Sequence, residues 1–137
     1  MSSTDKKKLV LKSSFEEMER VELFVEELQQ WAGFDDDNFS RILLVLSEAV
    51  NNAITHGNRQ DSGKKVFINA GLEKDILKVS IRDEGEGFDP DSLADPLKDE
   101  NLLKEGGRGV YLIKQYADDV QFLKNGRELA ISFRLDE

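Results

Sequence analysis

The sequence predicts one α+β domain built as a two-layer α/β sandwich, in which helices cover one face of a mixed or antiparallel sheet. Two observations predict this fold class. Apolar residues recur at three-and-four spacing in long segments, and they alternate with polar residues in short segments joined by turn residues. At 137 residues the chain fits a single domain, 1–137, with an adequate core, and it contains no internal repeat or linker. We expect about five strands, with the second face of the sheet partly open or used for pairing.

The first two elements are predicted to be a short strand and an amphipathic helix. Residues 6–11 form the strand, after a polar lead. Residues 15–31 form the helix, because their apolar side chains fall in register: Phe15, Met18, Val21, Val25, Leu28 and Trp31. We interpret these aromatic and methionine positions as core rather than as a cofactor site.

The clearest helical pattern of the chain begins at Phe39. Its buried face is predicted from seven apolar residues, Ile42, Leu43, Leu46, Ala49, Val50, Ala53 and Ile54. Acidic residues 35–37 precede the pattern, where the helix dipole favours negative charge. Gly57 follows it in the usual position of a stop residue.

A polar strip on this helix has two interpretations. Glu48 and Asn52 lie one turn apart, on the side opposite the apolar stripe, and both side chains can simply be solvated. Against this, adjacent Asn51 and Asn52 each cost about 0.5 kcal/mol in a helix interior, because their amides compete for backbone hydrogen bonds. Leu44 and Val45 also flank the strip. We therefore expect this side of the helix to face something other than bulk water.

Two hairpins complete the predicted sheet. Apolar residues alternate over 66–72, and a turn at 73–75 leads into a strand that ends at Asp83. Residues 120–124 run into Asn125-Gly126, the strongest short hairpin signal, and alternation continues to Leu135.

The strand that ends at Asp83 places a carboxylate on the core side of the sheet. Leu77, Val79 and Ile81 alternate with polar residues, so that period two puts Asp83 on the apolar face. Buried carboxylates need partners. The glycines that follow in D-x-G-x-G allow close approach of a ligand or a sharp turn, and an ordinary turn is the alternative interpretation.

A glycine-rich turn opens the last predicted helix. Gly106, Gly107 and Gly109 precede apolar residues that begin at Val110, and such a turn presents free backbone N–H groups to an anion. Arg108 adds a charge, although a flexible hinge with a solvated arginine is the alternative. The preceding segment, about 88–106, has no sustained period and is predicted to be a mobile lid, with a short helix or disorder without function as alternatives.

The three motifs together carry a resemblance. E-x-x-x-N on a helix, D-x-G-x-G after a strand and a glycine turn before a second helix resemble the Bergerat-type ATP-binding fold of gyrase-type topoisomerases, the ninety-kilodalton heat-shock chaperone, mismatch-repair ATPases and histidine kinases. Within that superfamily, the small size, the short lid and the wording of the motifs resemble the stand-alone anti-sigma-factor serine kinases of bacteria. The resemblance covers nearly the whole chain.

The resemblance implies catalytic and metal roles for the first motif. Asn52 would coordinate the Mg²⁺ that bridges the ATP phosphates, and Glu48 would act as general base on a partner's serine hydroxyl. Phosphoryl transfer needs little more than a positioned nucleophile, a metal and donors around the phosphates. An amide oxygen also suits Mg²⁺, which keeps several waters.

The same resemblance implies the nucleotide contacts of the other two motifs. The adenine amino group would donate a hydrogen bond to Asp83, in the motif that contains Gly85 and in which Gly87 gives the base room. In the last motif, residues 107–109, Gly107 and Gly109 would hold the phosphates beside Arg108 as the lid closes.

One position departs from the superfamily pattern. Members commonly have a threonine after a glycine in the last hairpin, as part of the adenine pocket, whereas here Arg127 follows Gly126. This departure weakens the expectation of tight adenine binding and leaves the fold prediction unchanged.

Composition restricts the partners and the compartment. The net charge of −9, from 28 acidic and 19 basic residues, disfavours nucleic-acid binding and makes basic protein partners more plausible. The chain has no cysteine, which excludes disulfides and thiolate metal sites. It has no apolar run long enough for a signal peptide or a membrane span, so we expect no membrane association and a cytoplasmic protein.

Two other kinase classes fit poorly. The single histidine, His56, lies at the end of the first-motif helix, where a capping interaction is the simpler interpretation than a phosphoacceptor. The chain has no room for the phosphoacceptor and dimerisation domain of a two-component kinase, and it has no GxxxxGK motif.

The expected function is a serine/threonine-protein kinase that uses Mg-ATP to phosphorylate an anti-sigma-factor antagonist of the STAS type, and that also sequesters a sigma factor. The resemblance implies a homodimer as well. The alternative is an ATP-binding regulatory module without kinase activity that controls a protein partner in a partner-switching pathway. A scaffold with an inactive site is a third reading.

Overall fold

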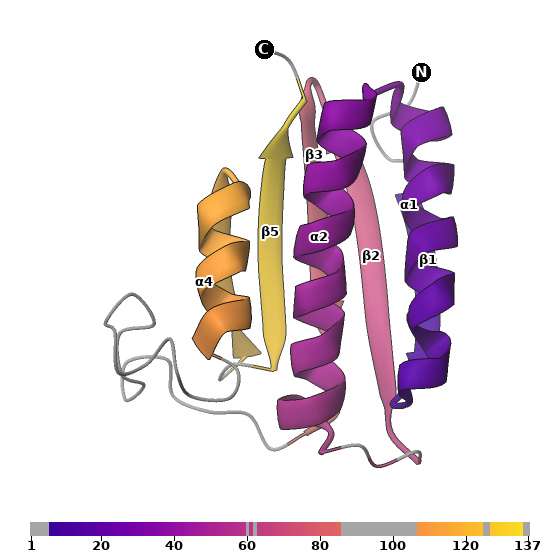
Figure 1. The fold of residues 1–137 in the computed structure, drawn as a ribbon, viewed down its shortest axis with the longest axis vertical. Coiled ribbons are helices and arrows are strands. Elements are labelled where there is room, and N and C mark those ends of the chain that lie inside the picture. The colour runs from indigo at the N-terminus through magenta and orange to yellow at the C-terminus, as the bar shows by residue number, and fades with distance from the viewer. Residues whose placement is uncertain (1–5, 60, 62, 86–106, 125–126, 136–137) are drawn as a thin grey trace.

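In the part of the chain that it describes, the computed structural model contains one five-stranded sheet and three α-helices (Figure 1). It describes residues 6–59, 61, 63–85, 107–124 and 127–135. The strands are β1 (Lys6–Lys12), β2 (Lys65–Glu73), β3 (Ile76–Arg82), β4 (Asp119–Leu123) and β5 (Glu128–Arg134). The helices are α1 (Met18–Ala32), α2 (Asp36–Asn52) and α4 (Gly107–Tyr116), with a 3-10 turn at Phe15–Glu17 and a π-helical turn at Ala53–Gly57.

The sheet has the strand order β1-β2-β3-β5-β4, and all four neighbouring pairs are antiparallel. All three α-helices lie on one face of it (Figure 1). The core between the two layers is built from α1, α2 and the inward residues of the strands, with Leu28, Ile42, Leu46, Ile68 and Phe133 among its largest fully buried side chains. The two-layer α+β prediction is confirmed, and the sheet is antiparallel among the described strands.

The start of α2 follows the expected capping chemistry. Asp35 has an extended backbone, and its Oδ1 accepts a hydrogen bond from the Asn38 N–H at 2.9 Å. Two more acidic residues occupy the first turn, where the helix dipole favours them.

The end of α2 differs from the prediction. The helix widens into the π-helical turn instead of ending at a left-handed glycine, and Gly57 is the last residue of that turn. Among the described glycines only Gly33, after α1, has a positive φ, of 78°. Gly57 is therefore no stop residue of the expected kind, and its need for glycine has another cause, which lies in the site.

The first helix starts later than predicted. Ser14 caps a 3-10 turn by accepting a hydrogen bond from the Glu16 N–H at 3.2 Å, and the α-helix itself begins at Met18. Phe15, predicted to be buried, is 49% exposed because it lies in this turn, outside the helical register. Four residues of α1 are fully or nearly fully buried: Val21, Phe24, Val25 and Leu28.

Strand register agrees with the predicted hairpins. Glu73 pairs with Ile76, so that β2 and β3 are joined by Lys74 and Asp75, with Lys74 at a φ of 56°. Leu123 pairs with Glu128. The turn residues Asn125 and Gly126 and the predicted lid, about 88–106, lie outside the described residues.

Candidate functional site

The predicted first and third motifs meet where the end of α2 lies against the start of α4. A Cβ atom placed on Gly109 would lie 2.9 Å from Glu48 Oε1 and 3.2 Å from Asn52 Nδ2. These distances are tight for a carbon atom, so a side chain at position 109 would make the ends of Glu48 and Asn52 move away from α4, whereas glycine lets all three lie close together. The polar strip of α2 thus faces a neighbouring helix and is only partly exposed, as predicted.

The start of α4 supplies the chemistry expected of an anion site. The first backbone N–H groups of a helix have no intrahelical partner, and they carry the positive end of the helix dipole. In α4 these groups belong to residues 107–109, directly beside Glu48 and Asn52. The arrangement places oxygen ligands and amide donors next to one another. Gly106 and the side chain of Arg108 lie outside the described residues.

Asp83, from the second motif, is buried at the end of β3. It is 8% exposed, its N–H donates to Arg127 O at 2.9 Å, and its Oδ1 accepts from the Gly85 N–H at 2.8 Å. Burial raises the pKa of Asp83 above its ordinary value, although the Gly85 N–H and the positive charge of Arg127 oppose the rise. The prediction of a core-side carboxylate is confirmed.

Two glycines allow the carboxylate of Asp83 to sit there. A Cβ on Gly57 would overlap Asp83 Oδ2 and Cγ and would lie 3.0 Å from Asp83 Cβ. A Cβ on Gly85 would overlap the carbonyl oxygen of Gly57 and would lie 2.6 Å from its carbonyl carbon. The first glycine of D-x-G-x-G is therefore needed for close backbone packing against the end of α2. Gly87 lies outside the described residues.

The sequence analysis missed Asn58, which ties these segments together. The side chain is 1% exposed, and its Nδ2 donates to Ser13 Oγ at 2.7 Å and to Lys65 O at 2.9 Å. Its Oδ1 accepts from the Glu84 N–H at 2.7 Å. One buried amide thus fixes the residue next to Asp83. The only sequence signal was a polar residue directly after Gly57, which looks like any loop residue.

The π-helical turn explains how one helix end serves both halves of the site. The Asn58 N–H donates to Ala53 O at 2.8 Å, across five residues instead of four. This wider turn keeps Asn52 beside α4 and directs Gly57 and Asn58 toward the end of β3. Single π turns are frequent at functional sites. His56 is exposed and lies in the last turn, at the helix end where the capping interaction is predicted.

The site offers oxygen ligands of the kind that Mg²⁺ prefers. The amide of Asn52 and the carboxylate of Glu48 both lie close to Gly109, and Mg²⁺ is commonly held by one or two protein oxygens, phosphates and water. No group of three or more His, Cys, Asp or Glu side chains in the described residues is arranged to hold a metal. These two residues fit an ion that also takes its ligands from a phosphate.

Comparison with known proteins shows the family of the chain. The model of the histidine kinase-like ATPase domain matches residues 11–134. The chain belongs to this family. The anti-sigma F factor of Bacillus subtilis is 36% identical over 101 residues, which are 72% of this chain and 68% of that protein. The serine-protein kinase RsbW of the same organism is 33% identical over 95 residues, 65% of this chain and 59% of that protein.

Two further comparisons define how far the likeness extends. The anti-sigma F factor of Oceanobacillus iheyensis is 36% identical over 89 residues, 64% of this chain, and the aligned part spans 61% of that relative's length. A crystal structure of the RsbU and RsbW domains of a Mycobacterium tuberculosis protein superposes with a TM-score of 0.65 at 17% identity. It covers 95% of this chain and 32% of that one, and supports the fold.

As a histidine kinase-like ATPase domain, the chain brings together the predicted residues in two groups. Glu48, Asn52 and Gly109 form one, and Asp83 and Gly85 form the other. The departure at Arg127 lies beside the second group, because its carbonyl oxygen accepts from the Asp83 N–H while its Nε donates to Lys124 O at 3.2 Å. No described helix is long and apolar enough to cross a membrane.

Proposed function

We propose that this domain binds Mg-ATP and transfers the γ-phosphoryl group to a serine of an anti-sigma-factor antagonist of the STAS type, and that it also sequesters a sigma factor. The observation that carries the proposal is the contact of Glu48 and Asn52 with the glycine start of α4. The printed names of the similar proteins, anti-sigma F factor and serine-protein kinase RsbW, support the biological role.

Each residue of the site has a role in this proposal. Asn52 holds Mg²⁺, which neutralises charge on the phosphates when it is bound. The N–H groups of residues 107–109 bind phosphate oxygens, with the side chain of Arg108 as an additional cation. Asp83 accepts a hydrogen bond from the adenine amino group, in a pocket that includes Gly85 and Gly87.

Glu48 is the proposed general base. Its carboxylate takes the proton from the serine Oγ of the antagonist, Oγ bonds to the γ-phosphorus, and the bond from that phosphorus to the bridging oxygen of ADP breaks. Phosphoryl transfer of this kind depends on positioning and on electrostatic stabilisation rather than on covalent chemistry by the protein. The close approach of Gly109 to Glu48 supports this role, because it brings the carboxylate next to the proposed phosphate-binding amides.

Transfer of a labelled γ-phosphate to a cognate antagonist tests the proposal. Glu48→Gln should lower the transfer rate by about 10² to 10⁴, the usual contribution of a general base, while the Kd for Mg-ATP stays within twofold. Glu22→Gln, at an exposed position of α1, is the matched control and should leave both values unchanged. Unimpaired transfer by Glu48→Gln would exclude Glu48 as the base.

The second candidate is a nucleotide-gated binding module without kinase activity. Arg127 favours it, because a long cationic side chain stands beside Asp83 where the superfamily commonly has a threonine. This candidate predicts Mg-ATP-dependent capture of the antagonist with no phosphate on any of its serines, which intact-mass spectrometry distinguishes from kinase activity.

The partners require two further proposals. The domain acts as a homodimer in the cytoplasm, where ATP and sigma factors are found, and no nucleic acid or membrane takes part. The face of the sheet that carries no described helix, or α1 with Leu23 at 61% exposure, provides the room for an interface. Light scattering of the purified protein at micromolar concentration gives the oligomeric mass directly.

A further inference from the structure

One stripe of α2, formed by Arg41, Glu48 and Asn52, contacts α4 at both of its ends. Arg41, Glu48 and Asn52 are separated by seven and four residues, so that they lie within about 20° of a common line on the helix. Arg41 contacts the end of α4 at Tyr116, whereas Glu48 and Asn52 contact its start at Gly109. The two helices therefore run antiparallel along this stripe, with the proposed catalytic groups at one end and Arg41 at the other.

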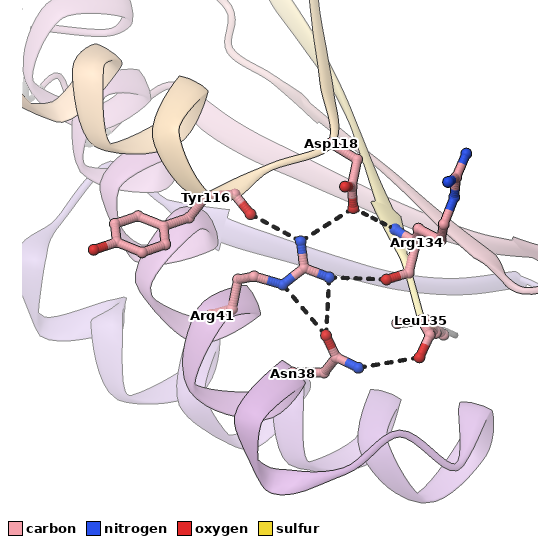
Figure 2. A network of polar contacts seen from close by, with 6 residues as sticks. All are labelled: Asn38, Arg41, Tyr116, Asp118, Arg134 and Leu135. Carbon is pink, nitrogen blue, oxygen red and sulfur yellow. Dashed lines mark hydrogen bonds and ion pairs between the residues drawn. The ribbon is translucent and has the colours of Figure 1, made fainter. Parts of the chain in front are cut away.

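All the N–H groups of the Arg41 guanidinium have partners (Figure 2). Nη1 donates to Tyr116 O at 2.9 Å and to Asp118 Oδ2 at 3.1 Å. Nη2 donates to Arg134 O at 2.9 Å and to Asn38 Oδ1 at 2.9 Å, and Nε donates to the same Asn38 oxygen at 3.3 Å. These contacts use the full fork of five donors, which lysine cannot reproduce.

These contacts join α2 to three other parts of the fold. Tyr116 O belongs to the last turn of α4, whose carbonyl groups lack intrahelical partners and attract cations. Asp118 lies between α4 and β4, and its Oδ2 also accepts from the Arg134 N–H at 2.6 Å. The guanidinium also lies over the ring of Phe133, 5.4 Å from its centroid, and the Arg41 side chain is 23% exposed. The guanidinium is thus held from several sides.

Because α4 is a short continuous helix, a displacement of its end at Tyr116 also displaces its start at Gly109. Gly109 and Tyr116 are seven residues apart, about 10 Å along the helix axis, and the helix between them contains the fully buried Ile113. At the start of α4, Gly109 lies close to the Glu48 carboxylate, since a Cβ placed there would be 2.9 Å from Glu48 Oε1, so a shift of α4 along its axis changes this separation directly. A contact that fixes the end of α4 therefore sets the separation between its start and Glu48.

We propose that Arg41 is a positioning residue of the nucleotide site: by fixing the end of α4 against α2, it holds the phosphate-binding start of α4 in place against Glu48 and Asn52. The inference rests on the proposed function, in which the start of α4 binds phosphate. Arg41 touches neither nucleotide nor serine and acts through α4. The stripe of α2 that serves the site thus extends from Asn52 back to Arg41, in the second turn of the helix.

The test compares Arg41→Lys and Arg41→Met with Arg20→Met. Arg20 is a matched control, because it is also a helical arginine that donates to a backbone carbonyl, Val10 O at 3.2 Å, and pairs with a nearby acid, but on α1, away from the site. We expect both Arg41 variants to raise the Kd for Mg-ADP about tenfold and to lower kcat for transfer by about 10- to 100-fold, since misplacement by about 1 Å costs that much. Arg20→Met should change neither value.

Two further measurements separate positioning from general destabilisation. Hydrogen exchange without nucleotide should show faster exchange for amides 110–113 in Arg41→Lys, with the amides of β2 and β3 unchanged. Asn38→Ala, which removes only the acceptor shared by Nε and Nη2, provides a milder variant if Arg41→Met does not fold. Wild-type nucleotide affinity and kcat in a folded Arg41→Lys, or equal losses in Arg20→Met, would overturn the positioning role.

Failure of the proposed function gives a different result. If the wild-type protein binds no Mg-ADP or Mg-ATP, the nucleotide proposal is wrong. The exchange measurement still decides whether Arg41 fixes α4: unchanged exchange at amides 110–113 would overturn the inference, and selective loss of protection there would support it.

Discussion

Replacing Gly57 with alanine should destabilise the fold through a single neighbour. The new Cβ would overlap Oδ2 and Cγ of Asp83 and lie 3.0 Å from its Cβ, a distance that real Cβ atoms essentially never go below. Asp83 cannot easily move away, because its N–H donates to Arg127 O at 2.9 Å and its Oδ1 accepts from the Gly85 N–H at 2.8 Å. Overpacking of a buried site costs about 1–3 kcal/mol, and we expect the upper half of that range.

Urea unfolding followed by the fluorescence of Trp31, the single tryptophan, measures the free energy of unfolding. Gly71→Ala is the matched control: its Cβ would meet only Lys6 Cγ, at 3.9 Å, and the change should stay within about 0.5 kcal/mol. Gly57→Ala should shift the midpoint clearly, with an unchanged slope.

A double-mutant cycle with Asp83→Ala tests the cause. Asp83→Ala removes the two overlapping atoms, although it leaves the Gly85 N–H without its acceptor, at a cost of about 1–3 kcal/mol. If the carboxylate is the obstacle, Gly57→Ala should cost at least about 1 kcal/mol less in the Asp83→Ala background than in the wild type. Additivity within about 0.5 kcal/mol would refute the reasoning.

Three more outcomes are expected. Gly109→Ala should weaken Mg-ATP binding by calorimetry by up to about tenfold, about 1.4 kcal/mol, because its Cβ, 3.2 Å from Asn52 Nδ2 and 2.9 Å from Glu48 Oε1, would make both side-chain ends move away from the start of α4. Asn58→Ala should lower the free energy of unfolding in urea by about 2–4 kcal/mol, and Ser13→Ala by less, since only the first leaves the Glu84 N–H without its acceptor. Burial raises the pKa of Asp83 in the folded state, so its stabilising contribution is complete below a pH of about 4 and is lost as the pH rises through the folded pKa. Urea midpoints measured from pH 4 upward should therefore decline more steeply in the wild type than in Asp83→Asn.

The elements that the sequence predicted well depend on local periodicity. The apolar stripe of α2 is buried at Ile42, Leu46 and Val50, and the alternation in β3 leads to a buried Asp83, because each pattern repeats with the geometry of its own element. The placement of Glu48 and Asn52 on the same side of α2, where both lie near Gly109, also follows from one helix alone. These predictions needed no knowledge of what lies opposite.

The predictions that failed, and the residue that was missed, depend on contacts between distant segments. Gly57 looked like a helix stop, yet its conformation is ordinary, and glycine is required there by Asp83, 26 positions later. Asn58 looked like a loop residue, yet its partners include Ser13, 45 positions earlier. No local pattern encodes such contacts, since they exist only after the sheet and α2 have packed together.

The net charge of the chain does not describe the charge of the sheet face that no described helix covers. The total of −9 favours basic partners, but strand alternation and exposure direct seven basic side chains outward: Lys6, Lys8, Lys12, Lys65, Lys78, Arg82 and Arg134. Only Glu73, Asp119 and Glu128 oppose them on the same face of the described strands. The acidic excess therefore lies on the rest of the molecule, and the sheet face does not repel an acidic surface.

The polar stripe of α2 shows why the site is harder to predict than the fold. On an isolated helix, Arg41, Glu48 and Asn52 would all be solvated. Their spacing alone does not distinguish a solvent-exposed stripe from one that packs against a second helix. The antiparallel approach of α4 determines what the stripe contacts. Glu48 and Asn52 lie beside Gly109 at the start of α4, and Arg41 contacts the carbonyl oxygen of Tyr116 at its end. Opposite ends of the same dipole thus select opposite charges on α2, a carboxylate beside the amino end of α4 and a guanidinium beside its carboxyl end. The charge order along α2 is therefore complementary to the direction of α4, and exchanging Arg41 and Glu48 would disfavour that direction.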